Sequence, residues 1–177
     1  NNTLIGGLAG DALTIGQKNV AVGYLALSAD VEGADNVAIG NGAMAATDNA
    51  RANVAIGFNS LYSLDYASFT DVYNVAIGYS AGTAMTTGIR NVLIGGLAGD
   101  ALTTGSSNIA IGLQALSTED EHGFNIAIGH NALASQNAGA DAYNVAIGHL
   151  AGEDITTGTE NTLVGGLAGD ALTTGVR

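Results

Sequence analysis

Hydrophobic and polar positions repeat along the whole chain with a period of about 17 residues. Each unit opens with a five-residue word: Asn, then Val, Ile or Thr, then Ala or Leu, then Ile or Val, then Gly. Eight units have 17 residues, the unit from Asn53 has 21 and the unit from Asn125 has 19. A short regular period predicts stacked repeats, in which each unit contacts its neighbours. The ten units begin at Asn2, Asn19, Asn36, Asn53, Asn74, Asn91, Asn108, Asn125, Asn144 and Asn161.

Positions 2 to 4 of each unit, counted from its Asn, predict a strand. Positions 2 and 4 are β-branched in every unit, and position 3 is always Ala or Leu. Because both sides of this strand are apolar, we expect it to be buried on both faces, with positions 2 and 4 in the core. The 12 residues between words are too few for a helical crossover. The sequence therefore predicts an all-β chain: a single parallel β-solenoid, or β-roll, over residues 1–177, with ten coils at a spacing of about 4.8 Å.

Large side chains alternate between two positions of each coil. Where position 9 is Gly, position 12 is Leu, Met or Ile, and where position 9 is Leu or Met, position 12 is polar. Only the 21-residue coil has two large residues, Leu61 and Leu64. This exchange predicts that one large side chain fills one corner of each coil. The invariant Asn at position 1 predicts a hydrogen-bonded ladder, and the invariant Gly at position 5 predicts a corner with positive φ.

Charge divides the coil in two. The chain has 16 acidic and four basic residues, a net charge of −12, and none of these residues lies at positions 1 to 9 of any coil. We expect an exposed apolar strip at positions 3 and 8, large enough to require a partner, and we infer a homo-oligomer, with a trimer as the preferred assembly. In the first, sixth and tenth coils we expect a Leu of one chain to fit against glycine of another. The predicted interface residues are Leu4, Ala38, Ala55, Ala76, Leu93, Leu97, Leu163 and Leu167.

The repeats also resemble those of known fibres. The segments NVAIGYSAGTAMTTG, NIAIGLQAL and NTLVGGLAGDALTTG are similar to the 17-residue NxAIGxxAL…TTG repeats of phage tail fibres. They resemble, more loosely, the SVAIG-type repeats in the heads of trimeric autotransporter adhesins. The resemblance covers the whole chain and implies a left-handed parallel β-roll in a trimer. It also implies a structural, non-catalytic segment of a longer fibre, extracellular, at a cell surface or on a virion, with an adhesion or receptor-binding role.

The composition offers little for catalysis. The chain has no cysteine, three histidines and no nucleophile, metalloprotease or phosphate-loop motif, so we expect neither an enzyme nor a cofactor. The acidic balance disfavours nucleic acid, and no apolar run is long enough for membrane insertion. The turn around Glu119 and Asp120 suggests either a calcium site or, as we favour, a solvated acidic face.

Two groups of side chains remain as weak candidate sites. His130 and His149 share position 6 of adjacent coils, about 5 Å apart, which suits either a stacked pair or, less favoured, a metal site. The long coil holds four aromatic residues that suit stacking on sugar rings of a cell-surface glycan, or packing against the rod or a neighbouring chain. They are Tyr62, Tyr66, Phe69 and Tyr73.

Three functional hypotheses follow from these patterns. The first is a fibre segment that projects or carries an adhesive surface. The second is a filament subunit that polymerises end to end, since the chain holds a whole number of coils with no capping sequence. The third is a glycan-binding module centred on the long coil.

Overall fold

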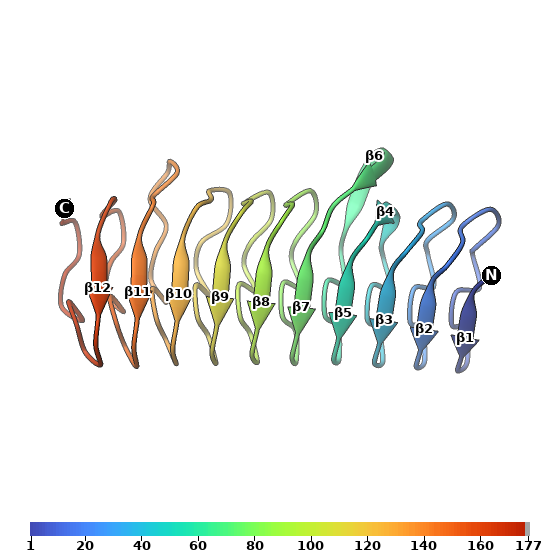
Figure 1. The fold of residues 1–177 in the computed structure, drawn as a ribbon, viewed down its shortest axis with the longest axis horizontal. Coiled ribbons are helices and arrows are strands. Elements are labelled where there is room, and N and C mark those ends of the chain that lie inside the picture. The colour runs from blue at the N-terminus through green and yellow to red at the C-terminus, as the bar shows by residue number, and fades with distance from the viewer. Residues whose placement is uncertain (176–177) are drawn as a thin grey trace.

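The computed structural model describes residues 1–175 and shows an elongated rod of stacked coils (Figure 1). The predicted all-β parallel solenoid is confirmed: within residues 1–175 there is no helix, and ten short strands pair in chain order as one parallel sheet. Neighbouring strands are in register, so that Val54 pairs with Val75 and Val75 with Val92. The strands are β1 (Thr3–Ile5), β2 (Val20–Val22), β3 (Val37–Ile39), β5 (Val54–Ile56), β7 (Val75–Ile77), β8 (Val92–Ile94), β9 (Ile109–Ile111), β10 (Ile126–Ile128), β11 (Val145–Ile147) and β12 (Thr162–Val164).

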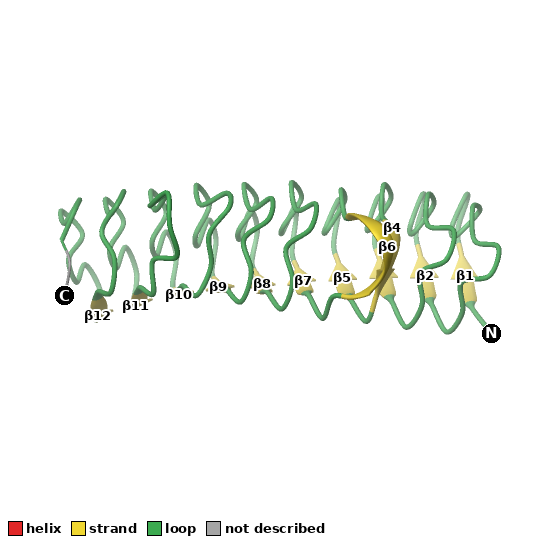
Figure 2. Cartoon of the chain, turned by 90° about the horizontal axis from the view of Figure 1, so that it is seen from above, coloured by secondary structure: helices red, strands yellow, loops and turns green. Residues whose placement is uncertain are grey.

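The long coil adds a second, smaller sheet. Strand β6 (Asp65–Asp71) lies within the 21-residue coil and pairs in parallel with β4 (Asp48–Arg51) of the coil before it. Figure 1 shows these two strands above the row of ten, and Figure 2 shows that turns and loops form the rest of each coil. The extra residues of the long coil therefore project from the rod.

Every coil turns sharply after its strand, at position 5. Gly6 has a φ of +131°, a value that residues with a side chain rarely adopt. A Cβ added there would lie 2.6 Å from the carbonyl oxygen of Gly23, its equivalent in the next coil. The predicted positive-φ corner is confirmed. Stacking at this spacing requires glycine both for its backbone conformation and because there is no space for a Cβ.

The orientation predicted for the strands is wrong. Ala38, Ala55, Ala76 and Leu93 at position 3 are fully buried inside the single chain, so they form no interface with another copy. Ala residues at position 8 are buried as well, except the partly exposed Ala168 of the last coil. The β-branched residues at positions 2 and 4 lie on the outer face, partly or fully exposed. The physical reason is the narrow interior of the coil. A large side chain from the opposite wall already fills most of it, and only Ala fits opposite at most levels.

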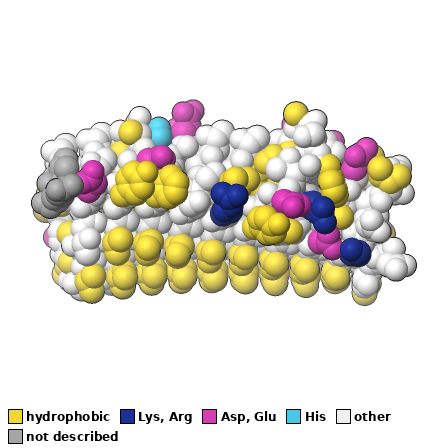
Figure 3. Space-filling view, turned by 45° about the horizontal axis from the view of Figure 1, so that its top comes forward, with side chains coloured by type: hydrophobic (Ala, Val, Ile, Leu, Met, Phe, Trp, Pro, Cys, Tyr) yellow, Lys and Arg dark blue, Asp and Glu magenta, His cyan; other side chains and the backbone are white. Residues whose placement is uncertain are grey.

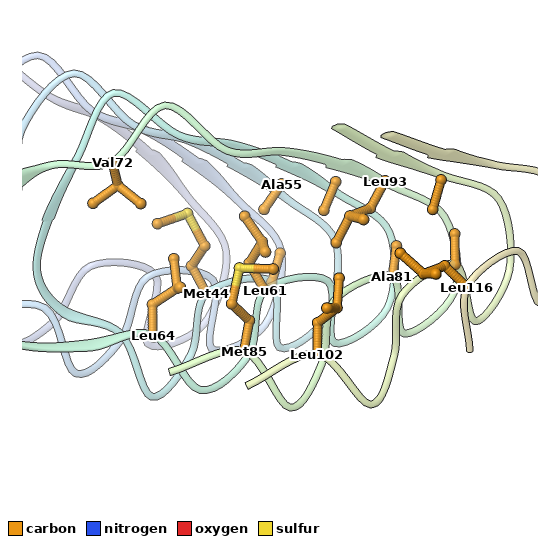
Figure 4. Close-up of a cluster of buried hydrophobic side chains, with 14 of the residues drawn as sticks. Met44, Ala55, Leu61, Leu64, Val72, Ala81, Met85, Leu93, Leu102 and Leu116 are labelled. Atoms are coloured by element: carbon orange, nitrogen blue, oxygen red, sulfur yellow. The ribbon is translucent and has the colours of Figure 1, made fainter. Parts of the chain in front are cut away.

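Large side chains fill the interior by the predicted exchange between positions 9 and 12. Figure 4 shows the resulting core, in which Leu93 points inward from the strand wall and Leu102 from the opposite wall. The long coil is the exception to this exchange, because it has a large residue at both positions. Both of them, Leu61 and Leu64, are fully buried. The other fully buried members of the exchange are Leu27, Met44, Met85, Leu102, Leu116, Leu133 and Ile155.

Leucine at position 3 fits against glycines of its own chain. A Cβ added to Gly99 would lie 2.8 Å from Cδ2 of Leu93, and one added to Gly82 would lie 2.7 Å from its Cδ1. Leu163 stands in the same relation to Gly152 and Gly169. The expectation that such a leucine fits against glycine of another chain is therefore wrong: the contact is made between positions 3 and 9 within one rod.

The predicted asparagine ladder is confirmed and runs without a break from Asn2 to Asn161. The backbone N–H of each Asn donates to the side-chain Oδ1 of the Asn before it, at 2.8–3.2 Å. In most coils the side-chain Nδ2 also donates to a carbonyl 14 residues later, as from Asn91 to Gly105 at 2.9 Å. Each side chain therefore links its coil to the following one and ties the end of its own coil to the start.

Candidate functional site

The outer face of the ten-stranded sheet is a continuous apolar surface along the rod. Its two rows, positions 2 and 4, consist of Val and Ile in eighteen of twenty places and of Thr in the other two. Even within the rod, Ile39 and Ile147 are 36% and 38% exposed. Figure 3 shows these hydrophobic side chains as regular rows along one edge of the molecule. We call this surface, formed by positions 2 and 4, the sheet face.

No charged residue lies on the sheet face. Asp, Glu, Lys and Arg are confined to position 10 and later in every coil, and Figure 3 shows them away from the hydrophobic rows. Contiguous apolar surfaces of this size are rare on proteins that work as monomers, so the sheet face is a candidate contact surface. The uncharged side predicted from the sequence therefore exists, although different residues form it.

The remaining predicted interface residues are only partly on the surface. Leu97 and Leu167 at position 7 face outward, with Leu167 53% exposed. Leu163 is partly buried against the core, and Leu4, at the same position 3 in the first coil, is 42% exposed. The role of these four residues in an interface stays a prediction.

The aromatic residues of the long coil divide into one buried and three exposed rings. Tyr66 is only 7% exposed, and its hydroxyl donates to the backbone oxygen of Gly88 at 2.8 Å. Burial raises the pKa of this hydroxyl. For Tyr66 the alternative of packing against its own rod is confirmed, and stacking of this ring on a sugar is wrong. Glycan binding stays a prediction for the exposed rings of Tyr62, Phe69 and Tyr73.

Arg51 organises the surface beside β6. Its guanidinium carbon lies 4.9 Å from the ring centroid of Phe69, and its nitrogens pair with Asp35 at 2.8 Å and Asp71 at 2.9 Å. The hydroxyl of Tyr73 lies 3.3 Å from Oδ2 of Asp71. Arg51 belongs to the preceding coil, so the aromatic residues of the long coil give no sign of it in the sequence.

A shallow pocket of about 240 Å³ opens next to Phe69. Its other lining residues come from the first two coils, so β6 reaches back along the rod. Tyr62 and Tyr73 do not line it. The pocket is lined by Ile15, Gln17, Glu32, Ala34 and Phe69.

His130 and His149 lie as close as the coil spacing predicts, with ring centroids 5.2 Å apart and planes tilted by 36°. Both side chains are exposed. Phe58 and Tyr79, at the same position 6, stack at 5.3 Å with planes 10° apart. Position 6 thus forms a row in which rings of adjacent coils stack, and metal binding by the histidine pair stays a prediction.

A cluster of three possible metal ligands lies in the seventh coil. Glu119, Asp120 and His122 each place a ligand atom within 4.8 Å of the others. The solvated acidic turn expected here is wrong for Glu119, which is fully buried at position 12. The two acidic residues were candidates from the sequence as a calcium site, which stays a prediction, whereas His122 and the burial of Glu119 were not foreseen. The exchange with Leu116 was the available signal, since it places position 12 in the interior.

Comparison with protein-family models, with curated proteins and with solved structures found no match to this chain. The described residues contain no helix that is long and apolar enough to cross a membrane.

Proposed function

We propose that this chain is a structural, non-catalytic segment of an extracellular fibre, at a cell surface or on a virion, in which identical rods associate side by side. The observation that carries the proposal is the sheet face, which is apolar, uncharged and continuous over ten coils. Burial of such a face from water is the main favourable term in protein association. A rigid rod with one adhesive side is suited to bundling into a fibre.

A second copy of the chain is the partner that fits the sheet face best. The β-branched rows repeat at the strand spacing, about 4.8 Å, and another stack of strands has ridges at the same interval. With a net charge of −12, two chains repel each other everywhere except where charge is absent. Identical rods that meet through their sheet faces keep their acidic residues apart and in water.

Lysine substitutions on the sheet face test the proposal. Ile56→Lys with Ile94→Lys places two charges on the outer sides of β5 and β8, at half-buried positions of the sheet face. We expect the molecular mass in light scattering to fall to that of one 17.5 kDa chain. The matched control is Thr87→Lys with Thr104→Lys, which adds two charges at exposed sites of the acidic side. A wild-type chain that is monomeric at every concentration contradicts the proposal, as does an oligomer that tolerates the sheet-face lysines.

The same measurement counts the copies. The trimer remains the expected assembly, with a mass three times that of the chain. A dimer, with two sheets facing each other about 10 Å apart, is the alternative result. Left-handed winding and end-to-end stacking of coils stay predictions from the sequence.

A further inference from the structure

We propose that Glu119, Asp120 and His122 form a binding site for one divalent transition-metal ion of the zinc type. A fibre segment needs no such ion, so the inference goes beyond the proposed function and stands independently of it. The ligand atoms of the three side chains already lie within 4.8 Å of one another. All three belong to the turn at the end of the seventh coil.

Glu119 is the residue that most requires a cation. Its side chain is fully buried, and Oε1 accepts the backbone N–H of His122 at 3.1 Å. The other oxygen, Oε2, is buried without a hydrogen-bond partner. A buried carboxylate is costly unless a positive charge compensates it. Among the ion pairs of the described residues, the group facing Glu119 is the His122 ring, whose Nδ1 lies 3.3 Å from Oε1.

The separation of these two atoms suits a shared ion. Zinc takes carboxylate oxygen and imidazole nitrogen at about 2.0–2.2 Å, and two ligands of a tetrahedral ion are then about 3.3 Å apart. Asp120 supplies a third ligand after a small movement of its carboxylate, and water can supply the fourth. One imidazole with two carboxylates favours zinc and similar transition ions over calcium or magnesium, which prefer oxygen alone.

The backbone of the turn is held in place before any ion binds. Thr103 donates its N–H to the carbonyl of Asp120 at 2.6 Å, and the side chain of Asn108 donates to the carbonyl of His122 at 3.1 Å. Because the preceding coil and the asparagine of the same coil hold the backbone of this turn, binding needs little further ordering of the backbone.

Asp30 shows that a buried carboxylate alone does not make the site. It occupies the same position 12 in the second coil, accepts the N–H of Gly33 at 2.7 Å and also has an unpartnered buried oxygen. Its neighbours at positions 13 and 15 are Val31 and Gly33, which offer no side-chain ligand. The seventh coil differs by having both an acidic residue and a histidine at those two positions.

The repeat itself supplies variants that should fold. His122→Gly and Asp120→Thr each introduce the residue most common at that position among the 17-residue coils, and Glu119→Gln introduces the residue of the following coil, Gln136. After treatment with a chelator, we expect wild type to bind one Zn²⁺ per chain in calorimetry. His122→Gly and Asp120→Thr should each weaken binding by about tenfold or more. Zn²⁺ should also raise the melting temperature of wild type and not of these variants.

Two further variants serve as controls. Asp30→Asn removes the equivalent carboxylate outside the cluster, and His130→Tyr removes the exposed histidine pair; both should bind Zn²⁺ as wild type does. Co²⁺ should give an absorption band of a histidine-ligated tetrahedral ion in wild type and lose it in His122→Gly. Absence of binding by wild type overturns the proposal, as does binding that survives His122→Gly or disappears in His130→Tyr.

Discussion

At the scale of single residues, the buried carboxyl group of Asp30 is the clearest departure from an apolar core. One oxygen accepts the N–H of Gly33, and the other has no partner. Burial raises the pKa of Asp30 to about 6, with a smaller contribution from the negative charge of Asp48. Asp30 lies at position 12 beside Leu27, where the interior has room for a short side chain and not for a second large one.

This pKa makes stability depend on pH in a defined direction. The folded pKa of about 6 lies above the unfolded value of 3.8, so that the folded chain holds the proton more tightly. The contribution of Asp30 to the free energy of unfolding is therefore fully present below about pH 4. It is lost as the pH rises to about 6, by up to about 3 kcal/mol.

Asp30→Asn keeps the acceptor and removes the titration. We expect urea denaturation to show that this variant gains stability over wild type as the pH is raised from about 4 to 6, and keeps that gain at higher pH. Asp11→Asn, at an exposed site, is the control and should follow wild type. An unchanged difference between Asp30→Asn and wild type across this range would contradict the assignment.

Two of the buried residues that the sequence did not reveal, Asp30 and Glu119, are acidic. Acidic side chains are rarely buried, so a prediction from residue type alone puts them in water. The exchange of large side chains between positions 9 and 12 indicated instead that position 12 lies in the interior, since Leu27 and Leu116 occupy position 9 of the same two coils. Asn at position 1 was placed correctly because it occurs in every coil, and only a repeated structural contact explains that.

At the scale of elements, the contact between Leu93 on β8 and glycines at position 9 explains how one coil accepts a large residue on its strand wall. Gly99 has a φ of +56°, and an added Cβ would lie 2.8 Å from a methyl group of Leu93. Leu116 adopts nearly the same φ at position 9 of its coil, +53°, so the lack of space beside Leu93 is what requires glycine here, and the backbone conformation only favours it.

A double-mutant cycle separates these reasons. Leu93→Ala should lower the free energy of unfolding by about 2–5 kcal/mol, because it leaves a cavity in the core. Gly99→Ala should lower it by about 1 kcal/mol or more through both the strained φ and the clash. In the double variant the clash is absent, so we expect it to lose about 0.5–3 kcal/mol less than the sum in chemical denaturation. Simple additivity of the two single changes would show that Leu93 does not meet residue 99.

The strands themselves were predictable to the residue, and their orientation was not. Alternation along positions 2 to 4 shows that two faces differ, but it does not say which is inside when both are apolar. Side-chain volume decides instead, since the interior admits Ala beside one large residue at most levels. Pairing of β4 with β6 was unpredictable for another reason: it joins an irregular segment to a neighbouring coil, and no repeat records it.

At the scale of the whole molecule, the period alone was enough to predict the rod, because each coil can satisfy its backbone only by stacking on the next. The same regularity placed His130 and His149 at the observed spacing. The cluster around Glu119 was not predictable in this way. It depends on a buried side chain meeting a histidine at a position where six of the eight 17-residue coils carry glycine.

Segregation of charge predicts how salt acts on association. The chain carries a net charge of −12, all of it away from the sheet face. Salt screens the repulsion between acidic sides and leaves burial of apolar surface intact, so association should strengthen as the ionic strength is raised from about 0.01 M to 1 M. Sedimentation equilibrium at both concentrations measures the effect. Weaker association at high salt would mean that ion pairs hold the rods together.

The asparagine ladder passes without interruption through the two coils that have more than 17 residues. Asn74 bonds to Asn53 at 3.1 Å across the 21-residue coil, and Asn144 to Asn125 at 3.2 Å across the 19-residue coil. Their surplus residues emerge as two loops that rise from the same edge of the rod, at the top of Figure 1. Length can therefore vary at this edge without disturbing the stack, which leaves evolution free to diversify it, and an engineer free to graft foreign peptides there.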